Sequence, residues 1–187
     1  MDDVKLKTTD LSLYNNSWYK PGHALKRIIW YIINCCCFRN PLMPFSGVKV
    51  FLLRLFGAKI GNGVVIKPSV NIKYPWFLKV GNNTWIGEQV WIDNLAMVTI
   101  GNNACLSQGA LLLTGNHDYK KTTFDLITGE ITIEDGVWIG AKAIVCPGVI
   151  CKSHAVLSVS SVASSNLEPY TVYSGNPATA IRKRIID

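Results

Sequence analysis

The residue of this chain that is best suited to acid–base chemistry is His117. It is one of three histidines, and it lies in a polar stretch, LTGNHDYKKTTFDLITGEIT, which interrupts a regular apolar pattern. An imidazole, with a pKa of about 6.5, can take a proton from a hydroxyl group near neutral pH. A histidine in a loop can also serve only as a local hydrogen-bonding group, and the pattern by itself leaves both roles open.

The cysteines do not have the spacing of a metal site. The six cysteines, at positions 35, 36, 37, 105, 146 and 151, form no Cys-x-x-Cys pair. Three of them are consecutive, which makes a poor disulfide framework. We therefore expect no metal, and a reducing, cytoplasmic setting.

Composition indicates a folded chain with a basic excess. Hydrophobic residues make up 49% and charged residues 17% of the 187 residues, which excludes a disordered chain, and the formal net charge is +7. Such a charge suits anionic or phosphorylated partners. The basic residues are scattered, with the densest group at Arg182, Lys183 and Arg184, so we do not expect nucleic acid as a partner.

The elements that must position His117 follow a six-residue repeat. Aliphatic residues return at every sixth position, and an aliphatic-Gly-Asn signature recurs with a period of 20 at Ile60, Val80 and Ile100. Because six is a multiple of two, each hexad can form one short strand whose aliphatic side chain always points inward. Three hexads make one triangular coil, and coils bury their faces against their neighbours. The repeating positions are Ile60, Ile66, Ile72 and Leu78; Val80, Ile86, Ile92 and Val98; Ile100, Leu106 and Leu112; and Ile133, Ile139, Val145, Cys151 and Leu157.

We therefore predict an all-β fold, a parallel β-helix of about five coils over residues 58–187. It would have a short C-terminal extension and a protruding loop at about 114–131, where the hexads stop. Asn-Gly and Asn-Asn pairs, as at 62–63 and 82–83, suit corners that need a positive φ. A leucine-rich repeat has a similar period, but its L-x-x-L-x-L-x-x-N pattern is missing.

Residues 1–57 are predicted to form a separate N-terminal helical segment. We expect helices over 23–37 and 46–56, ended by Asn40-Pro41 and Gly57. The charged start, MDDVKLKTTD, has no signal-peptide core. The stretch IIWYIINCCCF has 11 residues, whereas crossing a bilayer takes about 20. It fits either a helix packed on the main domain or an amphipathic helix at a membrane surface, with peripheral contact through residues 23–39 at the inner face of the membrane.

Four motifs resemble those of one known family. They are TGNHDY (114–119), GVWIGA (136–141), CPGV (146–149) and YSGNPA (173–178). In this order and spacing they resemble the hexapeptide-repeat, left-handed β-helix acyltransferases. The chain is most similar to O-acetyltransferases of colanic acid and related exopolysaccharide biosynthesis, and is related to galactoside and maltose O-acetyltransferases. Over residues 58–184, the resemblance implies a left-handed coil, a homotrimer with its sites between subunits, and acetyl transfer from acetyl-CoA to a sugar or glycan-lipid acceptor.

The resemblance also assigns roles to residues. His117 would be the general base that activates the acceptor hydroxyl, with Asp118 or a loop carbonyl orienting its imidazole. The backbone N–H of Ala141 would serve the acetyl end of the cofactor, and that of Val159 would make a second contact one coil later. Trp138 would flank the pantetheine arm; the alternative is that it only caps a coil edge.

The cofactor phosphates are assigned less directly. Ser164 and Ser165 align with a Thr-Lys pair that touches the cofactor in sugar acetyltransferases, so Ser164 is a predicted contact although the lysine is missing. Of two basic residues that follow the Gly-x-Pro motif in those enzymes, one aligns with Thr179 and one with Arg182. Arg182, with its two basic neighbours, is therefore expected to hold the phosphates, unless this group is a solvated tail.

For the acceptor, the resemblance points to Asp93 and Asn94, in the coil before that of His117. Trp76, Trp85 and Trp91 would either stack on a sugar ring or cover coil faces and subunit contacts. A free-sugar or xenobiotic acceptor remains an alternative, as does a noncatalytic β-helical binding protein. A β-helical carbonic anhydrase would need three histidines, two of them close together, and this chain does not have that spacing.

Overall fold

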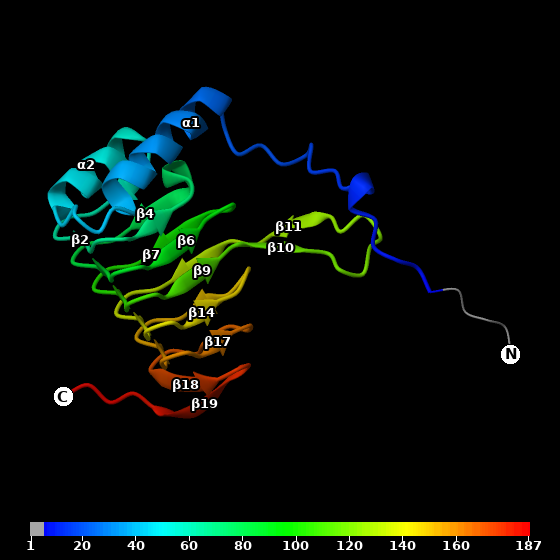
Figure 1. Ribbon diagram of the computed structural model, residues 1–187. Coiled ribbons are helices and arrows are strands. Elements are labelled where there is room, and N and C mark those ends of the chain that lie inside the picture. Colours follow the sequence, from blue (N-terminus) through cyan, green and yellow to red (C-terminus); the bar gives the residue numbers. More distant parts are fainter. Residues whose placement is uncertain (1–5) are drawn as a thin grey trace, which may run out of the picture.

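The chain winds into the predicted left-handed parallel β-helix, whose three sheets form the sides of a triangular prism (Figure 1). The computed structural model describes residues 6–187, so half of the charged N-terminal stretch lies outside the described residues. Sheet A has the strand order β1-β4-β7-β12-β15, sheet B has β2-β5-β8-β13-β16-β18-β19, and sheet C has β3-β6-β9-β14-β17. Each complete coil runs from sheet A through sheet B to sheet C.

Five complete coils are present, as predicted, and a sixth is incomplete. The first three coils are β1 (Lys59–Ile60), β2 (Val65–Ile66) and β3 (Asn71–Ile72); β4 (Leu78–Val80), β5 (Trp85–Ile86) and β6 (Trp91–Asp93); and β7 (Val98–Ile100), β8 (Cys105–Leu106) and β9 (Leu111–Leu113). The next two are β12 (Ile131–Ile133), β13 (Trp138–Ile139) and β14 (Ile144–Val145); and β15 (Ile150–Cys151), β16 (Val156–Leu157) and β17 (Val162–Ala163). The antiparallel pair β18 (Thr171–Gly175) and β19 (Ala178–Lys183) ends the solenoid.

The hexad side chains fill the inside of the prism. In sheet B they stack in one column, each at most 1% exposed, consisting of Ile66, Ile86, Leu106, Ile139 and Leu157. The column crosses the interrupting stretch without a break, since Leu106 pairs directly with Ile139. Corner residues Asn83 and Asn103 have the expected positive φ, at 54° and 52°.

Two helices close the open end of the first coil (Figure 1). α1 (Ala24–Ile33) continues into a wider π-helical turn, η2 (Asn34–Phe38), and α2 (Ser46–Leu55) follows. The predicted helix over 23–37 therefore has the right extent, with a widened last turn. None of the helices in residues 6–187 has the length and apolar character that crossing a bilayer would require.

Helix side chains bond to the strand edges that no further coil covers. Trp30 Nε1 donates to the carbonyl of Ile72 at 2.8 Å, and Lys49 Nζ donates to that of Lys67 at 2.7 Å. Burial lowers the pKa of Lys49, whose side chain is enclosed by the core. Trp30, Phe38 and Leu53 join the same hydrophobic core as the solenoid, so the inner faces of the helices pack on the main domain.

Candidate functional site

The stretch that carries His117 folds as a β-hairpin that projects from the prism (Figure 1). Its strands, β10 (Gly115–His117) and β11 (Leu126–Thr128), pair with His117 opposite Leu126. The hairpin leaves the solenoid after β9 of sheet C and returns at β12 of sheet A. Thr114 anchors its base, because the buried hydroxyl donates to the carbonyl of Asp93 at 2.8 Å.

The imidazole of His117 is oriented by a backbone carbonyl. Its Nδ1 lies 2.9 Å from the carbonyl oxygen of Phe124. Because a carbonyl can only accept, Nδ1 carries the hydrogen and Nε2 keeps a free lone pair. Of the two orienting groups predicted, the loop carbonyl has this role, whereas the Asp118 carboxylate accepts from the backbone N–H of Lys120 at 3.1 Å. The arrangement leaves Nε2 as the ring nitrogen that can accept a proton.

Two aromatic rings fix the plane of this imidazole. The ring of Phe124 stacks on that of His117, with centroids 4.4 Å apart and an interplanar angle of 6°, and Tyr14 lies 5.8 Å away at 55°. Phe124 has a φ of +51°, in the left-handed region that is unfavourable for an aromatic residue. Sequence reasoning missed both residues. Tyr14 is about 100 positions away, and no motif marks Phe124.

Replacing Phe124 by alanine is expected to lower kcat about tenfold and to leave the KM for acetyl-CoA unchanged. The variant keeps the carbonyl but loses the stacked ring, so the imidazole gains orientations that are not productive. Steady-state kinetics at saturating acetyl-CoA would measure this. Phe124→Tyr, which preserves the stacking, should retain most of the activity, and an equal loss in both variants would contradict the positioning role.

A groove of about 650 Å³ runs along the solenoid where sheet B turns into sheet C. It gathers four of the five residues predicted to contact the cofactor, namely Trp138, Ala141, Val159 and Arg182. Trp138 Nε1 donates to the hydroxyl of Ser107 at 2.8 Å, which fixes its indole along one wall. Ser164 is not among the lining residues, because it follows β17 on the far side of sheet C.

The floor of the groove offers backbone donors. Within residues 6–187, neither the N–H of Ala141 nor that of Val159 donates to another backbone carbonyl. The two positions occupy equivalent corners in successive coils, after β13 and β16. Gly140 allows the coils to approach here, since a Cβ at this position would lie 2.6 Å from the nitrogen of Val159.

Three basic residues lie at one end of the groove, on and just after β19. Lys183 Nζ donates to the Thr171 hydroxyl at 3.0 Å, and Arg184 Nη1 donates to the carbonyl of Gly136 at 2.8 Å. Together with Arg182, these side chains give one end of the groove a charge that suits phosphate groups. They are therefore part of the groove wall and not a free tail.

The groove and His117 lie at different edges of the prism. Ala141 and Val159 occupy the turns from sheet B to sheet C. Asp93 ends a strand of sheet C, Ser164 follows another, and His117 lies in the hairpin between sheets C and A. The width of sheet C separates the two sets within one protomer. The base is not among the residues that line the groove.

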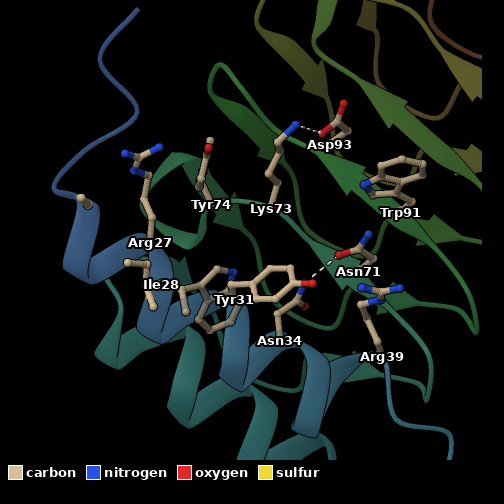
Figure 2. A pocket seen from close by; sticks show the side chains of 12 residues that line it. Arg27, Ile28, Tyr31, Asn34, Arg39, Asn71, Lys73, Tyr74, Trp91 and Asp93 are labelled. Carbon is tan, nitrogen blue, oxygen red and sulfur yellow. Dashed lines mark hydrogen bonds and ion pairs between the residues drawn. The ribbon is translucent and has the colours of Figure 1, made fainter.

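The two predicted acceptor residues differ in accessibility. Asn94 is fully buried, and its amide donates to the carbonyls of Tyr74 and Phe77 at 2.6 and 3.1 Å, so it holds a turn of the preceding coil. Asp93 has 12% of its side chain exposed and pairs with Lys73 at 2.9 Å. It faces a second cavity beside α1 (Figure 2). In residues 6–187, no three potential metal ligands gather.

The predicted tryptophans have separate roles. Trp76 stacks on Tyr74 with centroids 5.1 Å apart and donates to the carbonyl of Pro21 at 3.0 Å, so it secures the N-terminal segment. Trp85 and Trp91 lie on the outer faces of sheets B and C and are exposed. Those two remain available for a sugar or a subunit contact.

Comparison with known proteins identifies relatives along almost the whole chain. The chain is 36% identical over 167 residues to the putative colanic acid biosynthesis acetyltransferase WcaF of Escherichia coli (strain K12), covering 89% of this chain and 92% of that protein. It is 27% identical over 136 residues to the galactoside O-acetyltransferase of the same organism, covering 71% and 66%. No protein-family model matches the chain.

Solved structures share the fold. A hexapeptide-repeat acetyltransferase from Vibrio cholerae, in complex with acetyl coenzyme A, superposes with a TM-score of 0.77 at 22% identity, covering 87% of this chain and 88% of that one. A galactoside acetyltransferase in complex with coenzyme A gives a TM-score of 0.74 at 23% identity, with coverages of 85% and 80%.

Proposed function

Because the chain belongs to the hexapeptide-repeat acetyltransferase family and is an acyl-CoA-dependent acetyltransferase, we propose that it acetylates a hydroxyl group of a sugar. The proposed setting is exopolysaccharide or capsule synthesis in the cytoplasm. It is supported by the similarity to WcaF, a putative acetyltransferase of colanic acid biosynthesis. The single observation that carries the proposed chemistry is the 2.9 Å hydrogen bond between His117 Nδ1 and the Phe124 carbonyl, which leaves Nε2 free.

In the proposed reaction, Nε2 of His117 takes the proton of the acceptor hydroxyl as its oxygen attacks the thioester carbonyl of acetyl-CoA. The carbonyl oxygen becomes negative and accepts a hydrogen bond from the backbone N–H of Ala141. The tetrahedral intermediate then collapses, the C–S bond breaks, and the thiolate of coenzyme A leaves. The proton held by His117 returns to that sulfur, so the imidazole is neutral for the next cycle.

We assign acetyl-CoA to the groove. The acetyl end would lie at Ala141, the pantetheine arm beside Trp138 with a contact to the N–H of Val159, and the phosphates near Arg182. Lys183 and Arg184 extend the same basic end, which compensates for the lysine missing beside Ser164. In a homotrimer, Ser164 would approach the cofactor from the neighbouring protomer.

A homotrimer is proposed because one protomer keeps its base and its groove at different edges. Rotation about a threefold axis can bring the C-to-A edge of one copy against the B-to-C edge of the next. His117 would then face a neighbour's groove, and Asp93 would lie near the acceptor through the same contact. Asn94, being buried, would support that surface from below.

The acceptor class is tested by incubating the purified protein with labelled acetyl-CoA and a panel of acceptors. The panel holds nucleotide sugars, lipid-linked sugars, free sugars and an aromatic hydroxylated antibiotic. Transfer to the sugar conjugates, with label released by mild alkali as expected for an ester, supports the proposal. Transfer only to the antibiotic, or a transferred label that resists mild alkali as an amide does, would overturn the sugar-hydroxyl assignment.

A further inference from the structure

The outward faces of the two N-terminal helices are apolar. A helix that packs on a soluble domain usually turns a polar face to water. Here the exposed positions of α1 follow the helical repeat i, i+3, i+4, i+7, and α2 and the link before it also have exposed apolar side chains. The exposed large side chains are Leu25, Ile28, Ile29, Tyr31, Ile32, Leu42, Phe45, Val48, Phe51 and Leu55, which we call the α1–α2 face.

Charge is distributed very unevenly toward this end of the molecule. Between Asp10 and Glu88 the chain has ten of its nineteen basic residues and none of its twelve acidic residues. This stretch contains both helices and the first coil that they cover. The apolar face therefore belongs to a segment whose formal charges are all positive, which is complementary to an anionic surface.

A cavity of about 480 Å³ opens beside the same face, between α1 and sheet C (Figure 2). Its charged lining consists of Arg27, Arg39 and Lys73 with a single carboxylate, that of Asp93. Nε of Arg27 is buried and has no hydrogen-bond partner within the described residues. The guanidinium groups of Arg27 and Arg39 in this lining are the type of donor that phosphate oxygens match.

We propose that the α1–α2 face docks on an anionic lipid bilayer, with its apolar side chains among the lipid headgroups and acyl chains. The cavity beside it receives the phosphate of a lipid headgroup. Apolar area and basic charge both contribute to the strength of such binding. The docking goes beyond the proposed function. It rests on that function in one respect, because the proposed cytoplasmic location makes the inner leaflet of the membrane the target.

The orientation follows from the fold. The helices cover one end of the solenoid, the C-terminus lies at the other, and the hairpin projects sideways between them (Figure 1). Docking through the helices would leave the hairpin with His117 running alongside the membrane surface and the groove free for acetyl-CoA. A lipid-linked sugar could then reach the site without leaving the bilayer.

The test is sedimentation of the full-length protein with vesicles of phosphatidylcholine, with or without phosphatidylglycerol. We expect binding to the anionic vesicles that weakens with added salt. Ile32→Asp and Phe51→Asp, at positions 57% and 64% exposed, should each weaken partitioning roughly tenfold. Ile186→Asp, at 54% exposure near the opposite end of the solenoid, is the matched control and should bind as the wild type. Arg27→Gln combined with Arg39→Gln should remove the preference for anionic vesicles.

Three outcomes would overturn the docking proposal. The wild type could fail to bind either vesicle, or the Ile186 control could lose binding as much as the face variants do. The third outcome is that the face variants change the oligomeric mass measured by light scattering. The α1–α2 face would then be a contact between copies of this chain. Two variants distinguish a failure of the docking proposal from a failure of the proposed function. Phe51→Asp should still acetylate a water-soluble acceptor, and His117→Ala should still bind vesicles.

Discussion

Replacing His117 by alanine is expected to lower kcat by about 10²–10⁴-fold, the usual contribution of a positioned general base. The affinity for acetyl-CoA should not change, because His117 does not line the groove. The loss follows from the imidazole geometry, since the bond from Nδ1 to the Phe124 carbonyl reserves Nε2 for the hydroxyl proton. Steady-state kinetics gives the change in kcat, and titration calorimetry with acetyl-CoA in the absence of an acceptor gives the affinity.

The matched control is His154→Ala. His154 is the other histidine of the solenoid, and it stacks on Tyr170 with centroids 4.7 Å apart and an interplanar angle of 3°, so its surroundings also include an aromatic ring. It is not among the residues that line the groove, and its variant should keep turnover within about twofold of the wild type. A His117→Ala enzyme with near-normal turnover would rule out the base, and equal losses in both variants would point to a general effect on folding.

Mixed trimers should recover activity from two inactive parents. One parent is His117→Ala, which keeps an open groove, and the other is Ala141→Trp, whose indole would fill the groove but leave the histidine intact. If each site uses the histidine of one protomer and the groove of the next, random assembly in equal amounts leaves about a quarter of the sites complete. Co-expression with two affinity tags and tandem purification isolates the mixed species for assay.

The same experiment separates the two arrangements of the site. If both elements came from a single protomer, every site in the mixture would carry one defect and activity would stay at the level of the parents. Mixing the purified parents without subunit exchange provides the background. Activity in this mixture of unexchanged parents would mean that one parent was not inactive, and the comparison would then be invalid.

The solenoid could be predicted because its information is local and repeated. The same inward position is occupied by an aliphatic residue in each coil, as at Ile66, Ile86 and Leu106. An even number of residues between successive inward positions keeps their side chains on the same face. The contacts around His117 are of another kind. Tyr14 meets the imidazole only because the N-terminal segment runs back along the hairpin, where the N–H of Asp10 donates to the carbonyl of Thr122 at 2.8 Å. No periodicity encodes a contact between such distant segments.

The candidate site shows the same division. Trp138, Ala141 and Val159, which the family resemblance indicates, line one groove, and Ala141 and Val159 occupy equivalent positions in stacked coils. Asn94 was expected at the acceptor, but its amide is used to hold the turn at Tyr74 and Phe77. A polar residue type shows only that some partner is needed, and the sequence does not distinguish a buried carbonyl from a sugar.

The hairpin has a consequence for how such enzymes can diverge. The chain leaves the solenoid after Leu113 and re-enters so that Ile131 pairs with Val98, just as it would if the excursion were absent. Its length and residues are therefore uncoupled from the stacking of the coils above and below it. Insertions or transplanted segments at this point can reshape the surroundings of the histidine while the scaffold keeps its stability. New acceptor preferences can thus evolve in one loop, without a compensating change elsewhere in the solenoid.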